Sequence, residues 1–458
     1  MKKQLLLLAM ILLPMVASAD AVEIDGIYYK LISKIKEAEV TSNPNKYSGE
    51  VNIPETVTYN DVEYKITSIG DVAFNECSDL TSVIIPSSVV SIGNYAFQCC
   101  YGLTSVSIPN GVTKICDRAF NGCTNLVSIN IPSSVISIGS GAFYLCNSLT
   151  SVNISDLKAW CAIDFSPYGS SNPLEWAHHL YMNGEEIKDL VVPYGTLASR
   201  TFCGCTGLTS VTIGGNVETI GNSAFYGCSN LSSIILADGV NTIESSAFEG
   251  CTGITSITIP NSVTTIGSSA FSNCDNLIYI IIGKGVNSIG GQAFASCPEV
   301  TDVYCSAEEV PTTNSEAFKD SYIEHATLHV PEASLNLYKE AEPWKNFKEV
   351  TSPDTPKCAT PTISFIDGEI VFDCKTRDVV YVYEIKSLRT GMGNNVRIGY
   401  TNEYSVSVYA TKAGYIDSEI VTQEIDVHGL KGDINEDGNV TAQDASLILQ
   451  YIAKKISW

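Results

Sequence analysis

The sequence is poor in the residues and motifs on which common hydrolases depend. Only five histidines occur in 458 residues, and no His-Glu-x-x-His, Gly-x-Ser-x-Gly or phosphate-loop motif is present. Those motifs supply zinc ligands, an activated serine and a phosphate cradle, so the corresponding enzyme classes are not indicated. Paired carboxylates stay open as a catalytic option, because any fold can bring two acidic side chains together. The sequence therefore favours a protein that is not an enzyme.

Basic residues are also scarce. The chain has 27 Lys and Arg against 50 Asp and Glu, a formal net charge of −23. Loss of Lys2 and Lys3 with a leader peptide would bring the mature chain to about −25. A surface of this charge repels nucleic-acid phosphates and anionic lipid head groups. We therefore expect no nucleic acid among the partners.

Long apolar runs are missing except at the start of the chain. Residues 1–19 combine two lysines, a short apolar run and a small-x-small site that ends at Ala19. This pattern predicts a secretory signal peptide cleaved near Ala19, and its apolar run is too short to span a membrane. The first cysteine is Cys77, so a lipoprotein anchor is not expected. We predict a secreted or cell-surface protein with no membrane span.

The chain does contain one short pattern that returns at a fixed interval. The motif Ala-Phe-x-x-Cys places phenylalanines at 74, 97, 120 and 143, and again at 225, 248, 271 and 294, so the period is 23. Phe202 keeps the same step, although Thr201 replaces the alanine. A fixed period in the range of about 20–29 residues is typical of solenoids of the leucine-rich type. One such unit cannot bury its own apolar side chains, so stability must come from stacking.

Each repeat has two apolar segments. In the third copy Ile129 and Ile131 alternate with polar neighbours, which predicts a short strand that ends at Pro132. The second segment, Val-x-x-Ile-Gly-x-x-Ala-Phe-x-x-Cys, forms the returning side of the coil. Its glycine suits a tight bend, or a position crowded by the neighbouring coil.

The full pattern, Ile-Gly-x-x-Ala-Phe-x-x-Cys-x-x-Leu-x-Ser-Ile-x-Ile-Pro, resembles the BspA-type leucine-rich-repeat proteins of bacterial surfaces. Nine copies carry it, over roughly residues 60–350. The resemblance implies a mostly β leucine-rich-repeat solenoid with 23-residue coils. It also implies a role in adhesion and protein–protein contact rather than in catalysis.

Departures from the period mark the ends and the middle of the solenoid. Residues 20–64 read as an N-terminal cap, and residues 65–350 as the solenoid with a C-terminal cap. An insert at 155–195 breaks the spacing, so that Phe202 does not stand a whole number of repeats after Phe143. Its aromatic residues either fill a side core or line a ligand pocket. The pair His178-His179 raises a metal site as a further option, but adjacent residues of a strand point to opposite faces.

Nine of the 16 cysteines share one repeat position: Cys77, Cys100, Cys123, Cys146, Cys205, Cys228, Cys251, Cys274 and Cys297. We expect a buried column of free thiols that behave as small apolar side chains. Disulfides between neighbouring coils are the alternative. Cys358 and Cys374, outside the solenoid, are better candidates for a bridge.

The residues that face outward from the solenoid strands form two rows. The first reads Ser82, Ser105, Ser128, Ser151, Ser210, Ser233, Ser256, Tyr279, Asp302, and the second Ile84, Ser107, Asn130, Asn153, Thr212, Ile235, Thr258, Ile281, Tyr304. Most are small and polar, but Tyr279, Ile281 and Tyr304 form an apolar and aromatic cluster. Such a cluster predicts a contact patch, either for a partner or for the next domain of the chain.

Two further units follow the solenoid. Residues 358–428 contain several alternating segments separated by turn signals, which predict a small β-sandwich similar to immunoglobulin or fibronectin type III modules. Residues 429–458 carry a calcium-loop spacing, Asp-x-Asn-x-Asp-Gly, followed by an amphipathic helix. The expected Ca²⁺ ligands are Asp433, Asn435, Asp437, Asn439, Thr441 and Asp444.

This tail resembles a type I dockerin repeat, which implies attachment to a cohesin module. Dockerins have two such repeats, whereas here only one is complete, and Ala442 and Gln443 stand where Ser or Thr often contacts cohesin. The sequence as a whole predicts a secreted or cell-surface binding and adhesion protein. Its partner would be a host or microbial surface protein or glycan. A component of a polysaccharide-degrading complex, catalytic or not, and a structural spacer are the alternatives.

Overall fold

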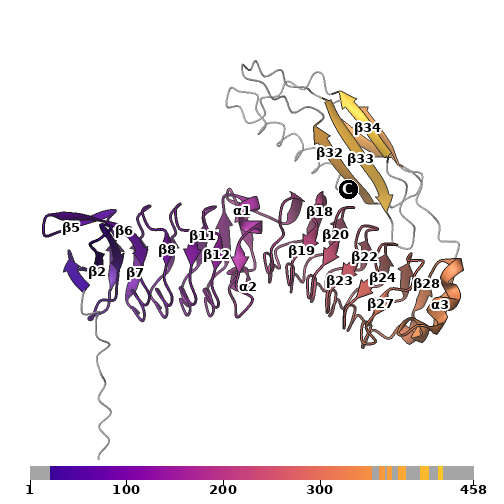
Figure 1. Cartoon of the computed structure of the whole chain (residues 1–458), viewed down its shortest axis with the longest axis horizontal. Coiled ribbons are helices and arrows are strands. Elements are labelled where there is room, and N and C mark those ends of the chain that lie inside the picture. The colour runs from indigo at the N-terminus through magenta and orange to yellow at the C-terminus, as the bar shows by residue number, and fades with distance from the viewer. Residues whose placement is uncertain are drawn as a thin grey trace, which may run out of the picture.

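The computed structural model describes residues 21–352 and five later strand segments: 361–366, 369–373, 380–387, 403–411 and 421–426. The predicted leader at 1–19, Cys358, Cys374 and the whole predicted calcium loop lie outside the described residues. Residues 21–352 form an elongated stack of coils with few helices (Figure 1).

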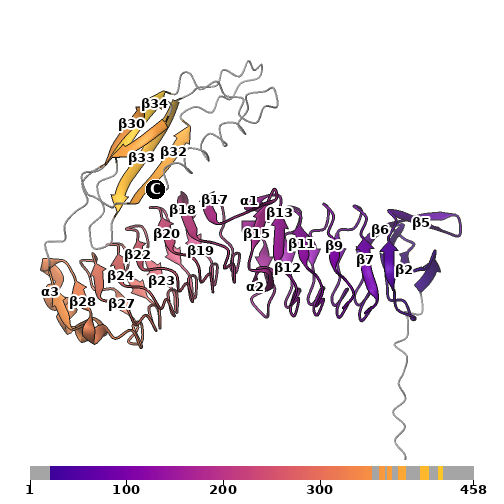
Figure 2. The ribbon, with the colours of Figure 1, turned by 180° about the vertical axis from the view of Figure 1, so that it is seen from behind.

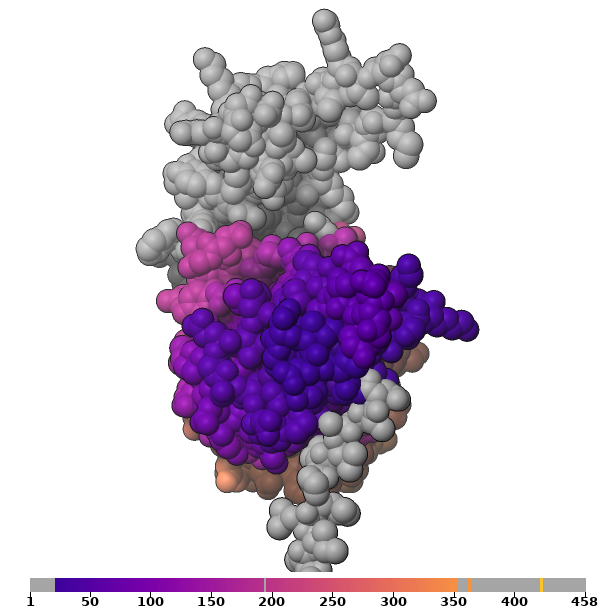
Figure 3. All heavy atoms as spheres, turned by 90° about the vertical axis from the view of Figure 1, so that its left-hand side faces the viewer, coloured from indigo at the N-terminus to yellow at the C-terminus, as the bar shows by residue number. Residues whose placement is uncertain are grey.

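Six strands precede the regular coils, and most of their pairings with one another are antiparallel. They are β1 (Ala21–Ile24), β2 (Ile27–Ile32), β3 (Glu37–Val40), β4 (Gly49–Asn52), β5 (Thr56–Tyr59) and β6 (Val62–Ile69). β2 pairs antiparallel with β1 and β3, and β5 pairs antiparallel with β6. β3 then pairs parallel with β6 and starts one sheet of the stack. Viewed from its N-terminal end, the stack is covered by these residues (Figure 3), which protects the sheet edge from pairing with another chain.

One long side of the stack is built from strands that we call the face strands. They are β4, β7 (Leu80–Ile84), β9 (Ser105–Ser107), β11 (Ser128–Ile131), β13 (Ser151–Ile154), β15 (Leu180–Met182), β16 (Glu185–Glu186), β17 (Asp189–Tyr194), β18 (Ser210–Asn216), β20 (Ser233–Leu236), β22 (Ser256–Ile259), β24 (Tyr279–Ile282), β26 (Asp302–Cys305), β28 (Thr327–His329) and β29 (Glu349–Thr351). Apart from the β15–β16 hairpin, the paired members run parallel.

Two-residue strands form the opposite side. They are β8 (Ser91–Ile92), β10 (Lys114–Ile115), β12 (Ser137–Ile138), β14 (Asp164–Phe165), β19 (Thr219–Ile220), β21 (Thr242–Ile243), β23 (Thr265–Ile266), β25 (Ser288–Ile289) and β27 (Thr312–Thr313). Their register advances by one repeat per coil, as in the pair Ile115–Ile138. The predicted solenoid with 23-residue coils is confirmed.

Between the two sides the repeated phenylalanines stack in a column. Neighbouring rings from Phe74 to Phe143, and from Phe202 to Phe318, have centroids 4.9 to 5.5 Å apart and planes within 2° to 12° of parallel. The repeated phenylalanines from Phe74 to Phe294 are 0% exposed. Equivalent rings therefore lie one above another, and they fill the interior that no single repeat can bury.

The column of cysteines lies beside the phenylalanines. All of the predicted members are free thiols, and each is buried. In seven coils the thiol donates to the carbonyl oxygen of the phenylalanine in the preceding coil, with S···O distances of 3.0 to 3.4 Å. Burial raises the pKa of the Cys146 thiol to about 12, because the thiolate would lose its hydration. The prediction of buried free thiols is confirmed.

The repeated glycine marks the closest approach between coils. A Cβ atom at Gly93 would lie 2.6 Å from the backbone nitrogen of Asp71 in the preceding coil, and one at Gly267 would lie 2.5 Å from that of Ser245. Both distances are well inside van der Waals contact. Crowding by the neighbouring coil therefore explains the glycine in these coils, whereas Cys116 and Glu244 occupy the same repeat position in two others.

The insert interrupts both sides of the stack. It contributes α1 (Leu157–Cys161) and α2 (Leu174–Ala177), and Asp156 caps α1 by accepting from the Ala159 N–H at 3.0 Å. The face strands before it end in the β15–β16 hairpin, while the opposite side ends at β14. Figures 1 and 2 show two runs of coils on either side of these helices. The phenylalanine column stops at Phe143 and resumes at Phe202.

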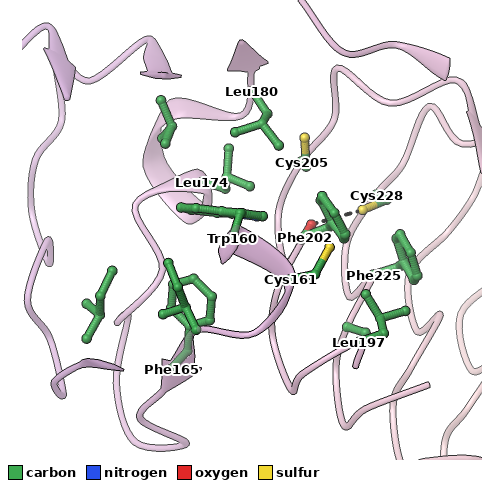
Figure 4. Close-up of a cluster of buried hydrophobic side chains, with 14 of the residues drawn as sticks. Trp160, Cys161, Phe165, Leu174, Leu180, Leu197, Phe202, Cys205, Phe225 and Cys228 are labelled. Carbon is green, nitrogen blue, oxygen red and sulfur yellow. Dashed lines mark hydrogen bonds between the residues drawn. The ribbon is translucent and has the colours of Figure 1, made fainter. Parts of the chain in front are cut away.

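Trp160 occupies the interior at this interruption. It is 1% exposed, its ring meets Phe165 edge to face at 5.3 Å, and its Nε1–H donates to the Thr201 carbonyl. Figure 4 shows it between the side chains of the two runs. The interior is therefore continuous although the sheets are not.

The C-terminal end of the stack is closed by short helices and a strand. These are η1 (Ile323–His325), η2 (Glu332–Ser334), α3 (Leu335–Glu340) and η3 (Trp344–Asn346), with β28 and β29 between and after them. Trp344 is fully buried against Phe318, edge to face at 5.5 Å. The last phenylalanine ring is thus covered by the cap rather than by another coil.

Five strands are described beyond the solenoid. β30 (Thr362–Ile366) and β31 (Glu369–Asp373) form an antiparallel hairpin, and β32 (Val380–Ser387), β33 (Glu403–Thr411) and β34 (Val421–Asp426) form an antiparallel sheet. These strands match the alternating segments seen in the sequence. The β-sandwich over 358–428 stays a prediction.

The crowding at the repeated glycine can be tested in one coil. We expect Gly93→Ala to lower the stability of the solenoid by about 1–3 kcal/mol, because the new methyl group is forced against the neighbouring backbone. Thermal unfolding monitored by circular dichroism measures the change. The control is Cys116→Ala, which places the same residue at the same repeat position one coil later. An equal loss in both variants would contradict the explanation.

The thiol column makes a second prediction. In the folded protein the nine column cysteines should resist iodoacetamide at pH 8, because their raised pKa values leave little thiolate and their sulfur atoms are buried. Cys99, which is only partly buried, should be labelled first. Mass spectrometry of peptides from native and urea-unfolded protein measures this. Labelling of the column at the rate of Cys99 without unfolding would refute it.

Candidate interaction surface

The outward side chains of the face strands line up as the sequence predicts. Ser82, Ser105, Ser128 and Ser151 are paired in register across four strands. In the second run of coils, Ser256 pairs with Tyr279 and Tyr279 with Asp302, while Thr258 pairs with Ile281 and Ile281 with Tyr304. We call this surface, with its two rows, the strand face.

The predicted contact patch lies at the C-terminal end of the strand face. Tyr279 and Ile281 come from β24, and Tyr304 from β26. The structure brings all three together, because Ile281 is the register partner of Tyr304. Tyr279 and Tyr304 are partly exposed, whereas Ile281 is only 8% exposed. The two tyrosines therefore provide the accessible part of the patch.

Two residues that the sequence did not indicate extend this patch. The His329 ring stacks on Tyr304 with centroids 4.1 Å apart and planes 7° from parallel, and its Nε2 lies 2.8 Å from Asp302 Oδ1. Thr301 donates its hydroxyl to the other oxygen of Asp302 at 2.8 Å. Burial is the main cause that raises the pKa of Tyr304. These contacts hold the Tyr304 ring in one orientation.

The sequence did not indicate His329 as part of the patch, because the 23-residue period fails just before it. One whole repeat counted from Tyr304 ends at Thr327, so a fixed step along the sequence does not align Tyr304 with His329. The structure nevertheless pairs Tyr304 with His329 in the register of β26 and β28. The only signal in the sequence was the apolar alternation of the last strand.

The insert places its histidines on different partners. His178 has a left-handed backbone with φ of 62°, and its Nδ1 lies 2.9 Å from the Gly204 carbonyl oxygen. His179 Nδ1 lies 2.6 Å from Glu186 Oε1. Within the described residues no group of three His, Cys, Asp or Glu side chains could hold a metal ion. Trp160 does not support a ligand pocket under the insert, because its side chain is buried in the core.

Open hollows on the described part of the solenoid include the following two. The larger, of about 570 Å³, is lined by residues that include Lys284, Asn287, Glu308 and Glu309. The smaller, of about 360 Å³, lies beside β21 and β23 and includes Glu244. Neither is lined by histidine or cysteine.

The remaining predicted site lies outside the described residues. It consists of the expected Ca²⁺ ligands Asp433, Asn435, Asp437, Asn439, Thr441 and Asp444. Among the helices that the structure describes, none combines the length and the apolar character needed to cross a membrane.

Comparison with solved structures finds several bacterial proteins, among others. A leucine rich cell surface protein from Faecalibacterium prausnitzii is 22% identical over 63% of this chain and 95% of its own, with a TM-score of 0.32. A leucine-rich repeat protein from Bacteroides ovatus is 25% identical over 68% and 100%, with a TM-score of 0.28. The pneumococcal vaccine antigen PcpA is 18% identical over 72% and 97%, with a TM-score of 0.44.

Comparison with curated proteins finds no match. Comparison with protein-family models finds the BspA type leucine rich repeat region, in six copies over residues 51–162 and 195–328. The gap between the two matched ranges falls on the insert, where the structure also interrupts the coils. Since these ranges make up more than half of the sequence, the chain belongs to the BspA type leucine rich repeat family.

Proposed function

We propose that this protein is a non-catalytic binding and adhesion protein, secreted or held at the cell surface, whose strand face recognises a surface protein or glycan of a host or another microbe. The observation that carries this proposal is the patch of Tyr279 and Tyr304 at the end of rows whose members are mostly small and polar. The predicted leader and membership in a repeat family of this type support the location and the role.

The strand face is rigid, and its two tyrosines differ in size and chemistry from the small polar residues around them. Serine, threonine and asparagine rows give a flat surface that a partner can approach closely, but they supply little binding energy on their own. Tyrosine is among the residues that most often dominate interface affinity, because a ring buries much area and loses few rotamers. The Tyr304 ring already stacks on His329, so the side chain loses little further conformational entropy when a partner binds.

The tail adds a second part to the proposal. We infer that Asp433, Asn435 and Asp437 converge on one Ca²⁺ ion, with the Asn439 carbonyl, Thr441 and Asp444 completing its oxygen shell. Calcium would then stabilise the segment 429–458. A dockerin-like role, with a cohesin as partner, would make the protein a component of a polysaccharide-degrading complex. This remains the alternative function, favoured only by the spacing of the loop.

The contact patch can be tested with substitutions taken from the other coils. Tyr279→Ser with Tyr304→Asn restores the small residues that most repeats carry at these positions, so the fold should be preserved. We expect at least a tenfold loss of affinity for whichever ligand the intact protein binds. Surface plasmon resonance against purified extracellular-matrix glycoproteins and their released glycans measures this.

The matched control is Ile84→Ser, at the opposite end of the same row. Ile84 is 61% exposed, so its loss removes an apolar side chain without disturbing the core. Its affinity should equal that of the intact protein. The patch has no role in binding if the double variant binds as tightly as the control does. Absence of binding to every ligand tested would count against the adhesion role itself.

The calcium loop has its own test. Isothermal titration of the full chain with CaCl₂ should show one site whose heat disappears in the variant Asp433→Ala with Asp444→Ala. Both substitutions remove carboxylates at the two ends of the loop, and hard cations depend on such oxygens. Asp417→Ala, outside the loop, is the control. Equal heats in the loop variant and the control would eliminate the site.

A further inference from the structure

A second group of large side chains lies on the edge of the stack formed by the Ala-Phe turns. In several turns two positions project outward, namely the residue two before the phenylalanine and the residue just after it, although the second position is buried at Cys203 and Ala295. Many coils carry small or polar residues there, such as Ser246, Ser269 and Asn121. Around the insert the edge instead carries large aromatic and basic residues. We call this set the aromatic strip: Tyr95, Arg118, Tyr144, Trp176, Arg200 and Tyr226.

Contacts connect the strip on the first run of coils. The Arg118 guanidinium lies over the Tyr95 ring, 5.6 Å from its centroid, and also reaches the Tyr95 hydroxyl at 3.4 Å. One coil further, the Tyr144 ring meets the Trp176 ring of the insert edge to face, with centroids 5.9 Å apart. These aromatic and cation–π contacts restrict the orientation of the rings.

The strip continues across the interruption. Arg200 Nη2 bonds Glu175 Oε1, next to Trp176, at 2.6 Å, and both side chains are less than one-fifth exposed. The following coil adds Tyr226, whose carbonyl oxygen accepts from the Gly204 N–H at 2.7 Å. The insert thus joins the two runs of coils along this edge, although it separates their sheets.

Two of the rings are well exposed, whereas Trp176 packs partly against the core, and the backbones of the two arginines are fixed. Tyr144 is 45% exposed and Tyr226 is 44% exposed. Arg118 and Arg200 occupy the left-handed region, with φ of 54° and 64°. Their backbones are held by bonds from Arg118 N–H to the Ser140 carbonyl and from Arg200 N–H to the Asn222 carbonyl.

The shape of the strip narrows the choice of ligand. It is only one or two side chains wide but crosses about six coils, roughly 25 Å at the usual spacing between strands. A folded protein partner would need a broad patch of about 800 Å² instead. An extended peptide that adds a strand needs free backbone groups. Here the turn N–H groups of Arg118, Gly122 and Gly204 already donate to the next coil.

We propose that the aromatic strip binds a neutral, linear polysaccharide. Sugar rings would pack their C–H faces against Tyr144, Trp176 and Tyr226, and their hydroxyls would bond to the side chains of Glu175 and Arg118. A neutral chain is favoured because Glu175 already neutralises Arg200, and the net charge of −23 repels acidic polymers. The strip lies on a different side from the strand face, so this proposal does not depend on the contact patch.

Affinity electrophoresis of the full chain in gels that contain polysaccharide tests the proposal. The neutral probes are a mixed-linkage β-glucan, an arabinoxylan and a galactomannan, and the acidic probe is polygalacturonate. At least one neutral probe should retard the protein. Tyr144→Asn with Tyr226→Ser, which installs residues found at this position in other coils, should weaken that binding at least tenfold. Tyr144→Phe with Tyr226→Phe should keep it within about threefold, because the stacking surface remains.

Two controls make the result specific. Tyr322→Ala removes a tyrosine that is 54% exposed but lies in the C-terminal cap, and it should bind as the intact protein does. Tyr279→Ser with Tyr304→Asn should also bind normally, which separates this surface from the contact patch. The proposal is overturned if no neutral probe binds, or if the Asn/Ser variant binds normally. Stronger retardation by polygalacturonate, or binding of an extended proline-rich peptide in place of the polysaccharides, would overturn it too.

Discussion

The stacking of identical coils, one phenylalanine ring upon the next, is the constraint on which the rest of the molecule depends. Neighbouring rings such as Phe97 and Phe120, 5.1 Å apart and nearly parallel, require each coil to repeat the backbone path of the previous one. The buried thiols reinforce this, because in seven coils the thiol donates to the carbonyl of the phenylalanine in the preceding coil. Any residue that changes the path of one coil therefore affects its neighbours, as the close approach at Gly93 shows.

In a solenoid of this kind, the residues that stabilise the fold are different from the residues that can contact a partner. The apolar side chains that hold the stack together are inside, so the outward positions of the strands and turns are free to vary. Serine and threonine predominate at most of these positions, with exceptions such as the exposed Ile84, and large aromatic side chains gather in two places. One is the end of the strand face at Tyr279 and Tyr304, and the other is the turn edge around the insert. Both lie where the regular period changes, which is where a new side chain meets fewer fixed neighbours.

The sequence predicted the solenoid, its outward rows and the free thiols because each follows from a single constant step between equivalent residues. It could not predict contacts that depend on a different step. His329 stacks on Tyr304 although a whole repeat counted from Tyr304 ends elsewhere, and Trp176 meets Tyr144 across an insert with no repeat at all. Arg200 and Glu175 likewise meet only because α2 folds back against the following coil. Local periodicity identifies the core, whereas the irregular segments supply most of the contacts that distinguish one surface from another.

The insert shows how the stack tolerates an interruption of its regular coils. Both sheets of the first run end within the insert, at β14 and at the β15–β16 hairpin, and a break of this kind would expose apolar interior to water. Trp160 helps to prevent this, because its buried ring belongs to the same core cluster as Phe143 and Phe202 and its indole N–H donates to the Thr201 carbonyl oxygen. Asn172 adds two bonds to the carbonyls of Arg200 and Thr201. The hydrogen bonds lost from the sheets are thus partly replaced at the turn edge, and the same replacement brings Glu175 and Trp176 beside the outward residues of the neighbouring coils.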